Sequence, residues 1–388
     1  MSKTAKRIIF ISNSIVPLKD AGGGSVVVYR HLKRLKNEGY QVVVIYLNSL
    51  ILGGQHDDDF KYVCVSKKNW HPPLRRKTPL LTKIRILLTF KYLTKIFRFN
   101  PDTDLILGIL GEVSNLLLLQ IRRKLGIPFY MFFHDDFIFN EYAHENLLTP
   151  KNINEVLKHS YYIFPVSDPL TNILLEKGIN NAARLYPIPE GYTGAGRAQF
   201  VNKGQGLNLL TAGTFGPVHF DILKKIGQAS NSTNSKFYCV TDLPLDLQGQ
   251  LTSGGNVSYV PRFHTTSQLF DYILKSIDIL IVFYSFNVST EPRLLTSFPS
   301  KFIEYCHLGL PIILIAPQQS SLGKWAVLNN WLCYIDNDEL SNISQQIEKL
   351  KDAAYWESSR EQSLLFAKND FNPDLIHEQF VNCLQLQY

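Results

Sequence analysis

The 388-residue sequence lacks the features that mark membrane-spanning and disulfide-rich chains. No stretch reaches about 18 uninterrupted apolar residues, and the one that comes closest, Leu105 to Leu119, is interrupted by Glu112, so we expect no membrane span. The five cysteines are far apart and form no Cys-x-x-Cys pair, which argues against a cysteine metal site and favours buried free thiols. Residues 1–7 lead straight into a strand-like segment without an apolar signal region, so we expect a cytoplasmic protein.

The composition is that of a folded globular protein. Hydrophobic residues make up 45% of the chain and charged residues 19%, which excludes a disordered chain. A chain of this length is longer than a single hydrophobic core usually supports, so we expect two domains of ordinary size. The sequence contains no solenoid-type repeat and no low-complexity tract.

Short apolar runs alternate with helix-like segments in two series. The runs of the first series are residues 8–12, 41–47, 104–110, 129–134 and 161–166, and those of the second are 207–212, 236–241, 257–261, 278–284, 311–316 and 332–335. Between them, residues 191–206 are rich in glycine and polar side chains, as is typical of a linker. We therefore predict an α/β fold with an N-terminal domain (1–190) and a C-terminal domain (207–371), each an open parallel sheet covered by helices. Ligands of such sheets gather at the carboxyl ends of the strands.

Two groups of residues that follow strands of the first series are candidates for ligand contact. Gly22, Gly23 and Gly24 lie between the first strand and a helix, where backbone amides approach an anion easily. The segment is not Gly-x-Gly-x-x-Gly, and a flexible turn is the alternative. His134 and Asp135 follow a strongly apolar strand, where an imidazole and a carboxylate can hydrogen-bond a sugar or move a proton. The alternative there is a helix cap with a satisfied histidine.

The most specific pattern lies at residues 297–311, which read Ser-Phe-Pro-Ser-Lys-Phe-Ile-Glu-Tyr-Cys-His-Leu-Gly-Leu-Pro. Ser300 follows a proline and is placed to begin a helix whose amides point at a diphosphate, with positive charge added by Lys301. Glu304 lies one turn further on the same face, within reach of ribose hydroxyls of the same ligand. The alternative is an ordinary capped helix with an exposed glutamate.

This segment resembles the Pro-Ser-Lys-x-x-Glu-Tyr-x-x-x-Gly-x-Pro signature of bacterial GT-B glycosyltransferases. The resemblance implies two Rossmann-like domains that face each other across a cleft, with residues 372–388 forming a helix that crosses back onto the N-terminal domain. It implies a nucleotide-sugar donor, a glycan or lipid-linked acceptor, and a role in surface polysaccharide or glycoconjugate biosynthesis. It implies no cofactor and no bound metal, because members of this fold usually need none.

The resemblance also implies roles for individual residues. The implied contacts are Glu304 with the ribose; Ser300, Lys301, Gly213 and Thr214 with the donor phosphates; Arg262 near the base; His134 near the transferred sugar; and Gly23 and Gly24 in the loop on the acceptor side.

Two departures from the family pattern bear on catalysis. Retaining members often carry a glutamate eight positions before the second one, where this chain has Thr296. Many also carry Arg and Lys after the first strand of the second domain, where this chain reads Gly-Thr-Phe-Gly-Pro over residues 213–217. Retention or inversion of the sugar configuration therefore stays open: Asp135 is the candidate base for inversion, whereas His134 orients the sugar in a retaining reaction. A non-catalytic GT-B scaffold and a nucleotide-sugar epimerase are the alternatives to a transferase.

Positive charge is concentrated between residues 61 and 98. This segment contains eleven Lys and Arg and no Asp or Glu, although the net charge of the whole chain is only +7. We expect it to bind an anionic membrane surface peripherally, on the inner face of the membrane, which suits a lipid-linked acceptor. Nucleic acid is the rival partner, but none is expected because no recognised binding module is present; a solvated charged face is the other alternative. The apolar stripe comprises Leu81, Ile84, Leu88, Tyr92 and Phe99, and the basic residues Lys83, Lys91 and Arg98 lie on another side.

Overall fold

The structure is a computed structural model of the chain. It describes residues 7–13, 15–19, 23–47, 58–65, 79–134, 149–190, 206–253, 256–289 and 291–385, without the side chains of 79–82 and 385. The chain divides into two compact units. The N-terminal unit comprises Met1–Tyr186 and His377–Tyr388, and the C-terminal unit comprises Pro187–Ile376. The expected linker, residues 191–206, lies outside the described residues apart from Gly206.

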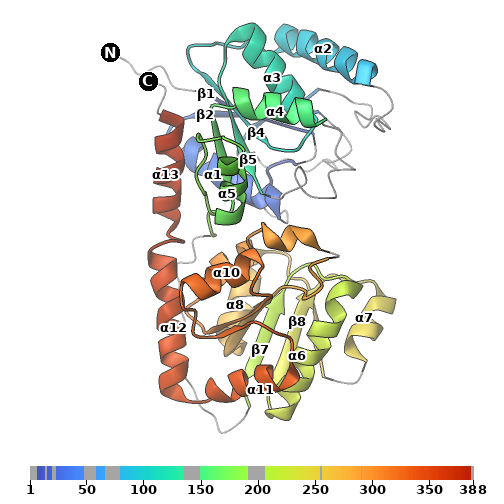
Figure 1. Ribbon diagram of the computed structural model, residues 1–388, viewed down its shortest axis with the longest axis vertical. Helices are drawn as coiled ribbons and strands as arrows, with labels where there is room; N and C mark the ends of the chain where they lie inside the picture. The colour runs from blue at the N-terminus through green and yellow to red at the C-terminus, as the bar shows by residue number, and fades with distance from the viewer. Residues whose placement is uncertain are drawn as a thin grey trace. The chain divides into compact units, whose positions relative to one another are not determined.

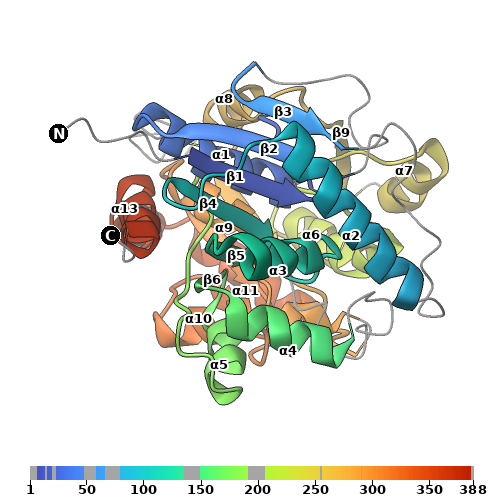
Figure 2. The same ribbon diagram turned by 90° about the horizontal axis from the view of Figure 1, so that it is seen from above.

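The N-terminal unit contains a parallel sheet with helices on both faces (Figures 1 and 2). Its six described strands lie in the order β3-β2-β1-β4-β5-β6. The strands are β1 (Arg7–Ser12), β2 (Gln41–Tyr46), β3 (Lys61–Cys64), β4 (Asp104–Ile109), β5 (Phe129–Phe133) and β6 (Tyr162–Pro165). The helices are α1 (Gly24–Asn37), α2 (Pro79–Ile96), α3 (Ser114–Leu125), α4 (Pro150–His159), α5 (Asp168–Glu176) and α13 (Pro373–Gln385).

Burial on both faces explains why these strands are continuous apolar runs. Ile8 to Ile11 of β1 are fully buried, and each of the five residues of β5 is at most 1% exposed. The short edge strand β3 was not predicted. Its apolar run, residues 62–65, is only four residues long, and the strand residues are half-buried apart from the exposed Lys61. Helix α1 ends where expected, since Gly39 adopts a left-handed φ of 93° just after the helix.

The last helix, α13, packs on the N-terminal unit from His377 onward. The ring of Phe380 lies 5.5 Å from Phe132, 5.0 Å from Phe164 and 4.9 Å from His31, measured between ring centroids. The side-chain amide of Gln379 also donates to the backbone oxygen of Arg184 at 2.7 Å. These contacts close the core over β5 and β6 with a segment that is far away in the sequence.

An ion pair ties the amino ends of the two central strands of this sheet. Arg7 at the start of β1 donates to the two carboxylate oxygens of Asp104 at 2.9 and 2.7 Å, and Asp104 begins β4. The Asp104 side chain is fully buried and also accepts from the backbone N–H of Asn100 at 2.7 Å. The guanidinium of Arg7 further lies 4.5 Å from the centre of the Phe97 ring. The negative charge of the buried Asp104 carboxylate is therefore balanced by the Arg7 guanidinium, and both of its oxygens accept hydrogen bonds.

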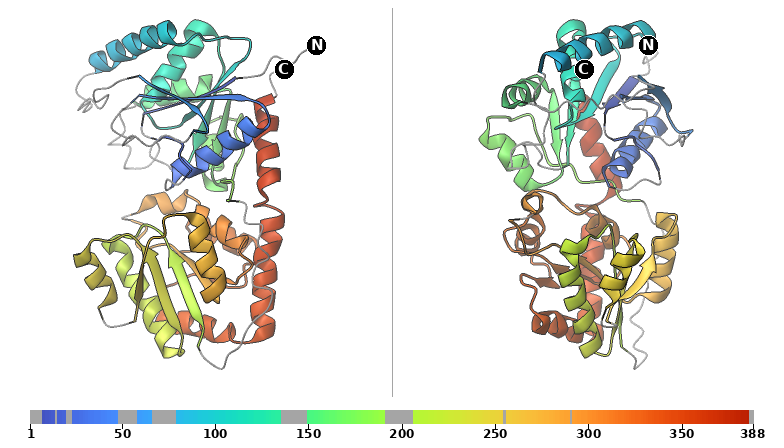
Figure 3. Two further views of the ribbon diagram at one scale, coloured as in Figure 1. Left: turned by 180° about the vertical axis from the view of Figure 1, so that it is seen from behind. Right: turned by 90° about the vertical axis from the view of Figure 1, so that its right-hand side faces the viewer.

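The C-terminal unit repeats this architecture, again with helices on both faces of the sheet (Figure 3). Its six described strands lie in the order β12-β11-β10-β7-β8-β9. The strands are β7 (Asn208–Ala212), β8 (Lys236–Thr241), β9 (Ser258–Pro261), β10 (Ile279–Phe283), β11 (Ile312–Ile315) and β12 (Tyr334–Ile335). The helices are η3 (Pro217–His219), α6 (Phe220–Ser232), α7 (Leu245–Thr252), α8 (Thr266–Ser276), η4 (Pro292–Leu295), α9 (Ser300–Cys306), α10 (Ser321–Leu328), α11 (Leu340–Lys349) and α12 (Ala353–Lys368).

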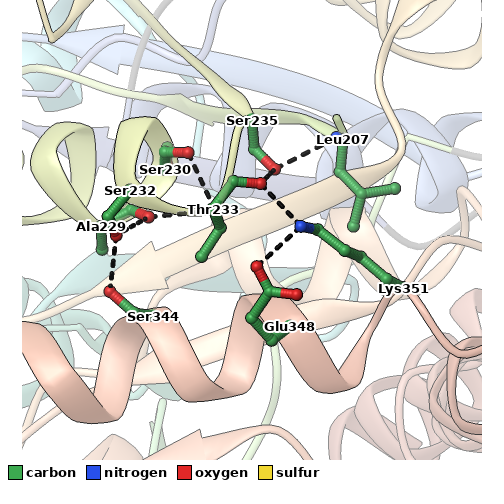
Figure 4. Close-up of polar contacts among 9 residues, drawn as sticks. All are labelled: Leu207, Ala229, Ser230, Ser232, Thr233, Ser235, Ser344, Glu348 and Lys351. Carbon is green, nitrogen blue, oxygen red and sulfur yellow. Dashed lines mark hydrogen bonds and ion pairs between the residues drawn. The ribbon is translucent and has the colours of Figure 1, made fainter. Parts of the chain in front are cut away.

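Polar contacts at the end of α6 join this helix to α11 (Figure 4). The ammonium of Lys351 donates to the backbone oxygen of Thr233 and to the Glu348 carboxylate, both at 2.7 Å. The hydroxyls of Ser232 and Ser344 lie 3.1 Å apart. Because the last carbonyls of a helix have no partner within the helix, a lysine from the neighbouring segment satisfies one of them at this end of α6.

Each sheet has one point where the strand order reverses. In the N-terminal unit the chain moves from β1 outward to β3 and then returns to place β4 on the other side of β1. In the C-terminal unit β10 returns in the same way to the other side of β7. The loops that leave the carboxyl ends of these strand pairs diverge, and the crevice between them is where ligands of open α/β sheets bind. The β7–β10 and β1–β4 edges are therefore where a site is expected.

Among the described residues, no helix is both long enough and apolar enough to cross a lipid bilayer.

Candidate functional site

The central element of the candidate site is α9, which follows the β10 loop and begins at the carboxyl edge of the C-terminal sheet. The Glu304 side chain is nearly buried, with 4% of the residue exposed, and its Oε2 lies 3.1 Å from the ammonium of Lys301. The neighbouring Tyr305 is fully buried, and the backbone of Ala212, the last residue of β7, lies beside its hydroxyl. Burial raises the pKa of Tyr305 strongly, so this hydroxyl stays protonated. Helix α9 thus carries a buried carboxylate paired with a cation, and the next residue, Tyr305, lies against the end of β7.

For residues 297–311 the alternative to a ligand site was an ordinary helix with an exposed glutamate. Glu304 is buried, so this alternative is wrong. Ser300 is the first residue of α9, as predicted, and Pro299 is its N-cap without a side-chain hydrogen bond. The Lys301 side chain remains 37% exposed, so it is available to a ligand at the surface of this edge. The structure therefore brings Ser300, Lys301 and Glu304 together within the first five residues of one helix.

The loop after β7 carries Gly213 and Thr214 to the same edge. The backbone N–H of Gly213 donates to the oxygen of Val240, which anchors the start of the loop to β8. A side chain at position 213 would lie about 3.1 Å from the ring of Phe215, which stacks at 5.3 Å on Phe283 at the end of β10. The loop after β7 and the end of β10 therefore contact each other at the point of strand reversal.

Two residues of this edge were not predicted from the sequence: His219 and Glu291. The backbone N–H of Gly216 donates to Nδ1 of His219 at 3.2 Å, which assigns the proton of the neutral ring to Nε2. That Nε2 lies 3.9 Å from Oε2 of Glu291, whose other oxygen accepts from Arg293 at 3.1 Å. Burial lowers the pKa of His219 against the opposing effect of the Glu291 carboxylate, so the ring is neutral at pH 7.

This group offers complementary polar atoms to a ligand. The Glu291 residue is only 9% exposed, and its Oε2 has no hydrogen-bond partner among the described residues. The Arg293 side chain is 54% exposed and carries a permanent positive charge. A buried carboxylate oxygen that lacks a donor is costly unless a ligand or water supplies one. No local pattern marks the pair in the sequence, because His219 and Glu291 belong to loops that only the strand order brings together.

Arg262 lies at a different part of the edge. It follows β9, the edge strand, and its guanidinium is 3.7 Å from the carboxylate of Asp242, which follows β8. Both side chains are more than half exposed, so this pair contributes little to stability. The sheet order puts β9 two strands from β7, about 10 Å away at the usual strand spacing. Arg262 is thus on the same edge as α9 but is not in the group around Glu304.

In the N-terminal unit, the structure places the glycine turn next to His134. Gly23 has a φ of 58° and precedes α1, and a side chain added at Gly24 would lie 3.5 Å from Nδ1 of His134. These predicted residues therefore lie together at the carboxyl ends of β1 and β5. Asp135, the candidate base, lies outside the described residues.

Glu112 is a further carboxylate that the sequence did not single out as a site residue. It follows β4 and is 8% exposed, and it accepts from the hydroxyls of Ser12 and Ser114 at 2.8 and 2.7 Å. The backbone N–H of Asn13 also donates to it at 3.0 Å. These bonds join the ends of β1 and β4 across the reversal point of the N-terminal sheet. Glu112 thus shapes the loop that leads to Gly23 and Gly24.

The buried histidine of α1 makes the stability of the N-terminal unit sensitive to pH. His31 is fully buried between aromatic rings, and burial lowers its pKa well below the usual 6.5, with smaller contributions in the same direction from His377, His134, Arg34 and Arg30. The unfolded chain takes up a proton near pH 6.5 while the folded chain does not, so acidification below about pH 6.5 favours unfolding.

We expect His31→Leu to lose less stability than the native chain when the pH falls from 7.5 to 5.5. Urea unfolding at both pH values measures this, and His159→Leu, on the exposed side of α4, serves as the control. Equal losses in the native chain and in His31→Leu would show that another group is responsible for the acid sensitivity.

The comparison with known proteins bears on the fold. No protein-family model and no curated protein matches the chain. Among solved structures, a glycosyltransferase from Rickettsia africae is 13% identical with a TM-score of 0.68, over 99% of this chain and 100% of that one. A variant of S. aureus TarM, in complex with fondaparinux, alpha-GlcNAc-glycerol and UDP, is 9% identical with a TM-score of 0.68, over 98% and 100%.

HepE from Anabaena, in complex with UDP, is 12% identical with a TM-score of 0.64, over 97% of this chain and 99% of that one. The chain has the GT-B fold. The two GT-B units correspond to the two parallel sheets with their helices, and the similarity covers both of them over nearly their whole length. At this level of identity, the similarity establishes the fold and leaves the site to be argued from the residues of this chain.

Within the described residues, no group of three or more His, Cys, Asp or Glu side chains is arranged to hold a metal ion.

Proposed function

We propose that this GT-B chain is a glycosyltransferase that moves a sugar from a nucleotide-sugar donor to a glycan or lipid-linked acceptor. The observation that carries the proposal is the pairing of the buried Glu304 with Lys301 on α9, the helix whose Tyr305 lies beside the end of β7. A buried carboxylate suits two ribose hydroxyls, and an adjacent exposed cation suits a diphosphate. The two UDP complexes among similar structures make UDP the first nucleotide to test.

Sugar transfer requires several residues at the carboxyl edge of the C-terminal sheet to act on the donor. The bond between the sugar C1 and the β-phosphate oxygen breaks, and a bond from C1 to the acceptor hydroxyl oxygen forms. Lys301 and Arg293 stabilise the negative charge that develops on the leaving diphosphate, together with the amides around Gly213 and Ser300. The acceptor hydroxyl loses its proton to a base, for which Asp135 is the candidate in an inverting reaction. His134 orients the transferred sugar, and no bound metal is expected to take part.

The site also favours one alternative. Thr296 occupies the position of the first family glutamate and is buried without a charge, and the 213–217 loop contains no Arg or Lys. Such a chain could retain the nucleotide pocket as a non-catalytic scaffold. Release of nucleoside diphosphate from a donor in the presence of an acceptor distinguishes the two functions, because a scaffold binds the nucleotide without turnover.

Isothermal titration with UDP, GDP, ADP and dTDP tests the proposed donor site. We expect selective binding of one nucleotide, with the diphosphate bound more tightly than the matching monophosphate because Lys301 and Arg293 act on the second phosphate. Selective binding would then limit the donor search to sugars carried by that nucleotide. Absence of binding to all four would contradict the donor site, and with it the transferase.

The setting of the reaction is the remaining part of the proposal. A glycan or lipid-linked acceptor would be bound by the N-terminal unit, in surface polysaccharide or glycoconjugate biosynthesis on the inner face of the membrane. We propose that α2 provides the surface that would bring the enzyme to such an acceptor.

A further inference from the structure

Helix α2 has two apolar faces, of which only one is covered. The inner face packs on α3 and buries Ile86, Leu93 and the adjoining Phe97, which recur at helical spacing (Figure 2). The outer face leaves five large apolar side chains between 43% and 60% exposed. They are Ile84, Leu87, Leu88, Tyr92 and Ile96. Three members of the stripe expected from the sequence, Ile84, Leu88 and Tyr92, therefore lie on the outer face and not in the core. The expectation is wrong for Phe99, which lies beyond the helix and is half-buried, with its ring centroid 4.9 Å from that of Phe97.

The outer face also carries a row of cations beside the apolar row. Ile84, Leu88, Tyr92 and Ile96 follow one another at intervals of four residues, so they form one continuous row along the helix. Leu87, Lys91 and Lys95 form the adjacent row, and Arg98 follows just beyond the helix. Lys83, Lys91, Lys95 and Arg98 are all exposed. No Asp or Glu occurs anywhere from Phe60 to Pro101, so the sequence around α2 supplies no carboxylate to neutralise them.

We infer that the outer face of α2 is a docking surface for an anionic lipid bilayer. A helix that lies in the membrane interface places an apolar row among the acyl chains and a basic row at the headgroups, and the outer face of α2 has this arrangement. The 18-residue helix is about 27 Å long. In the docked state it lies parallel to the membrane surface, with the exposed side chains of its outer face directed at the lipid. Lysine stems extend toward the headgroups while the apolar chains enter the interface.

The same residues argue against the other occupants of this face. A second copy of the chain in a twofold arrangement would bring like rows of cations together, which repel. Single-stranded nucleic acid binds by stacking its bases on several exposed aromatic side chains, but Phe90 is half-buried and Phe97 is buried, which leaves Tyr92 as the exposed aromatic among the described side chains of this face. Exposed Leu and Ile gain most from a partner that removes them from water, and a bilayer does so.

The inference rests on the proposed function in one respect: docking would bring the enzyme to a lipid-linked acceptor. Docking itself requires neither donor nor acceptor. Vesicle binding and nucleotide titration are therefore independent measurements: loss of docking with intact nucleotide binding removes this inference alone, and docking without nucleotide binding removes the proposed function alone.

The test is sedimentation of the full chain with vesicles of phosphatidylglycerol and phosphatidylcholine at a ratio of about three to seven, against vesicles of pure phosphatidylcholine. We expect binding to the anionic vesicles that weakens at high salt. Because each Lys or Arg near such a surface strengthens partitioning about fivefold, the triple variant Lys91→Gln, Lys95→Gln and Arg98→Gln should lower it on the order of a hundredfold. The double variant Leu87→Gln and Leu88→Gln should lower it about tenfold, since two apolar chains no longer enter the interface.

The matched control removes the same charge from another part of the N-terminal unit. Lys124, Lys151 and Lys158 are exposed at the end of α3 and on α4, and their conversion to glutamine should leave vesicle binding nearly unchanged. An equal loss in the control triple would show that net charge alone attracts the chain and would overturn the inference. So would insensitivity of binding to the two leucines, which is the behaviour of a surface that binds any polyanion, or self-association through α2 in sedimentation velocity.

Discussion

We expect Glu304→Gln to lower the affinity for the preferred nucleoside diphosphate about ten- to a hundredfold. A hydrogen bond to a charged group contributes about 1.5–3 kcal/mol when its partner is removed, and about 1.4 kcal/mol corresponds to a factor of ten. Glutamine has nearly the shape of glutamate, so the packing around α9 is kept, but the negative charge that pairs with Lys301, and that we propose binds the ribose, is lost. Calorimetric titration of the native chain and of the variant measures the difference.

The ribose assignment has a sharper test in the same experiment. If Glu304 accepts from the ribose hydroxyls, the native chain discriminates against the 2′-deoxy form of its nucleotide, and Glu304→Gln loses much of that discrimination. Glu357→Gln is the matched control, because Glu357 pairs with Arg360 three positions away on α12, as Glu304 pairs with Lys301 on α9. Unchanged affinity in Glu304→Gln, with the thermal unfolding of the native chain, would remove Glu304 from the donor site.

Arg7→Met should destabilise the N-terminal unit by about 3 kcal/mol, far more than the loss of an exposed ion pair. The Arg7 side chain is 22% exposed, but its removal leaves the fully buried Asp104 carboxylate with the Asn100 N–H as its remaining donor among the described residues. Removing one partner of a buried ion pair typically costs about 3–5 kcal/mol, and the partial exposure of Arg7 favours the low end. Urea unfolding followed by circular dichroism measures the loss.

Two further variants separate the buried charge from simple loss of contact. In Arg7→Met combined with Asp104→Asn, the uncompensated charge is gone, so part of the stability should return. Arg123→Met removes an ion pair with Glu155 whose side chains are 46% and 35% exposed, and it should cost less than about 1 kcal/mol. If Arg7→Met and Arg123→Met lost the same free energy of unfolding, the buried Arg7–Asp104 pair would stabilise the β1–β4 pairing no more than an exposed ion pair does.

Several features of the fold could be predicted because they are local. The strands are buried on both faces and therefore appear as short apolar runs, which is why most of them could be recognised without knowing the sheet order. Gly39 marks the end of α1 because few other residues adopt its positive φ. The half-buried edge strand β3 was missed because its apolar run is only four residues long, residues 62–65, and lies in the strongly basic segment.

The candidate site shows the same division. Ser300, Lys301 and Glu304 could be predicted together because residues three and four positions apart lie on the same face of a helix with 3.6 residues per turn. His219 and Glu291 could not, because they are 72 positions apart and meet only since β10 returns to lie beside β7. The same holds for Gly24 and His134 at the N-terminal sheet, which were each named but not paired.

The sequence by itself determined the alternation of strands and helices, the division into two α/β halves, the helix that carries Glu304 and the concentration of positive charge around α2. Each depends on residues within one or two turns or one strand. Only the tertiary structure decided which loops meet at the strand reversals, and that α2 turns its second apolar row outward while the first covers α3. Those outcomes depend on the order of strands and on which helix face finds a partner, and both are set by contacts between segments far apart in the chain.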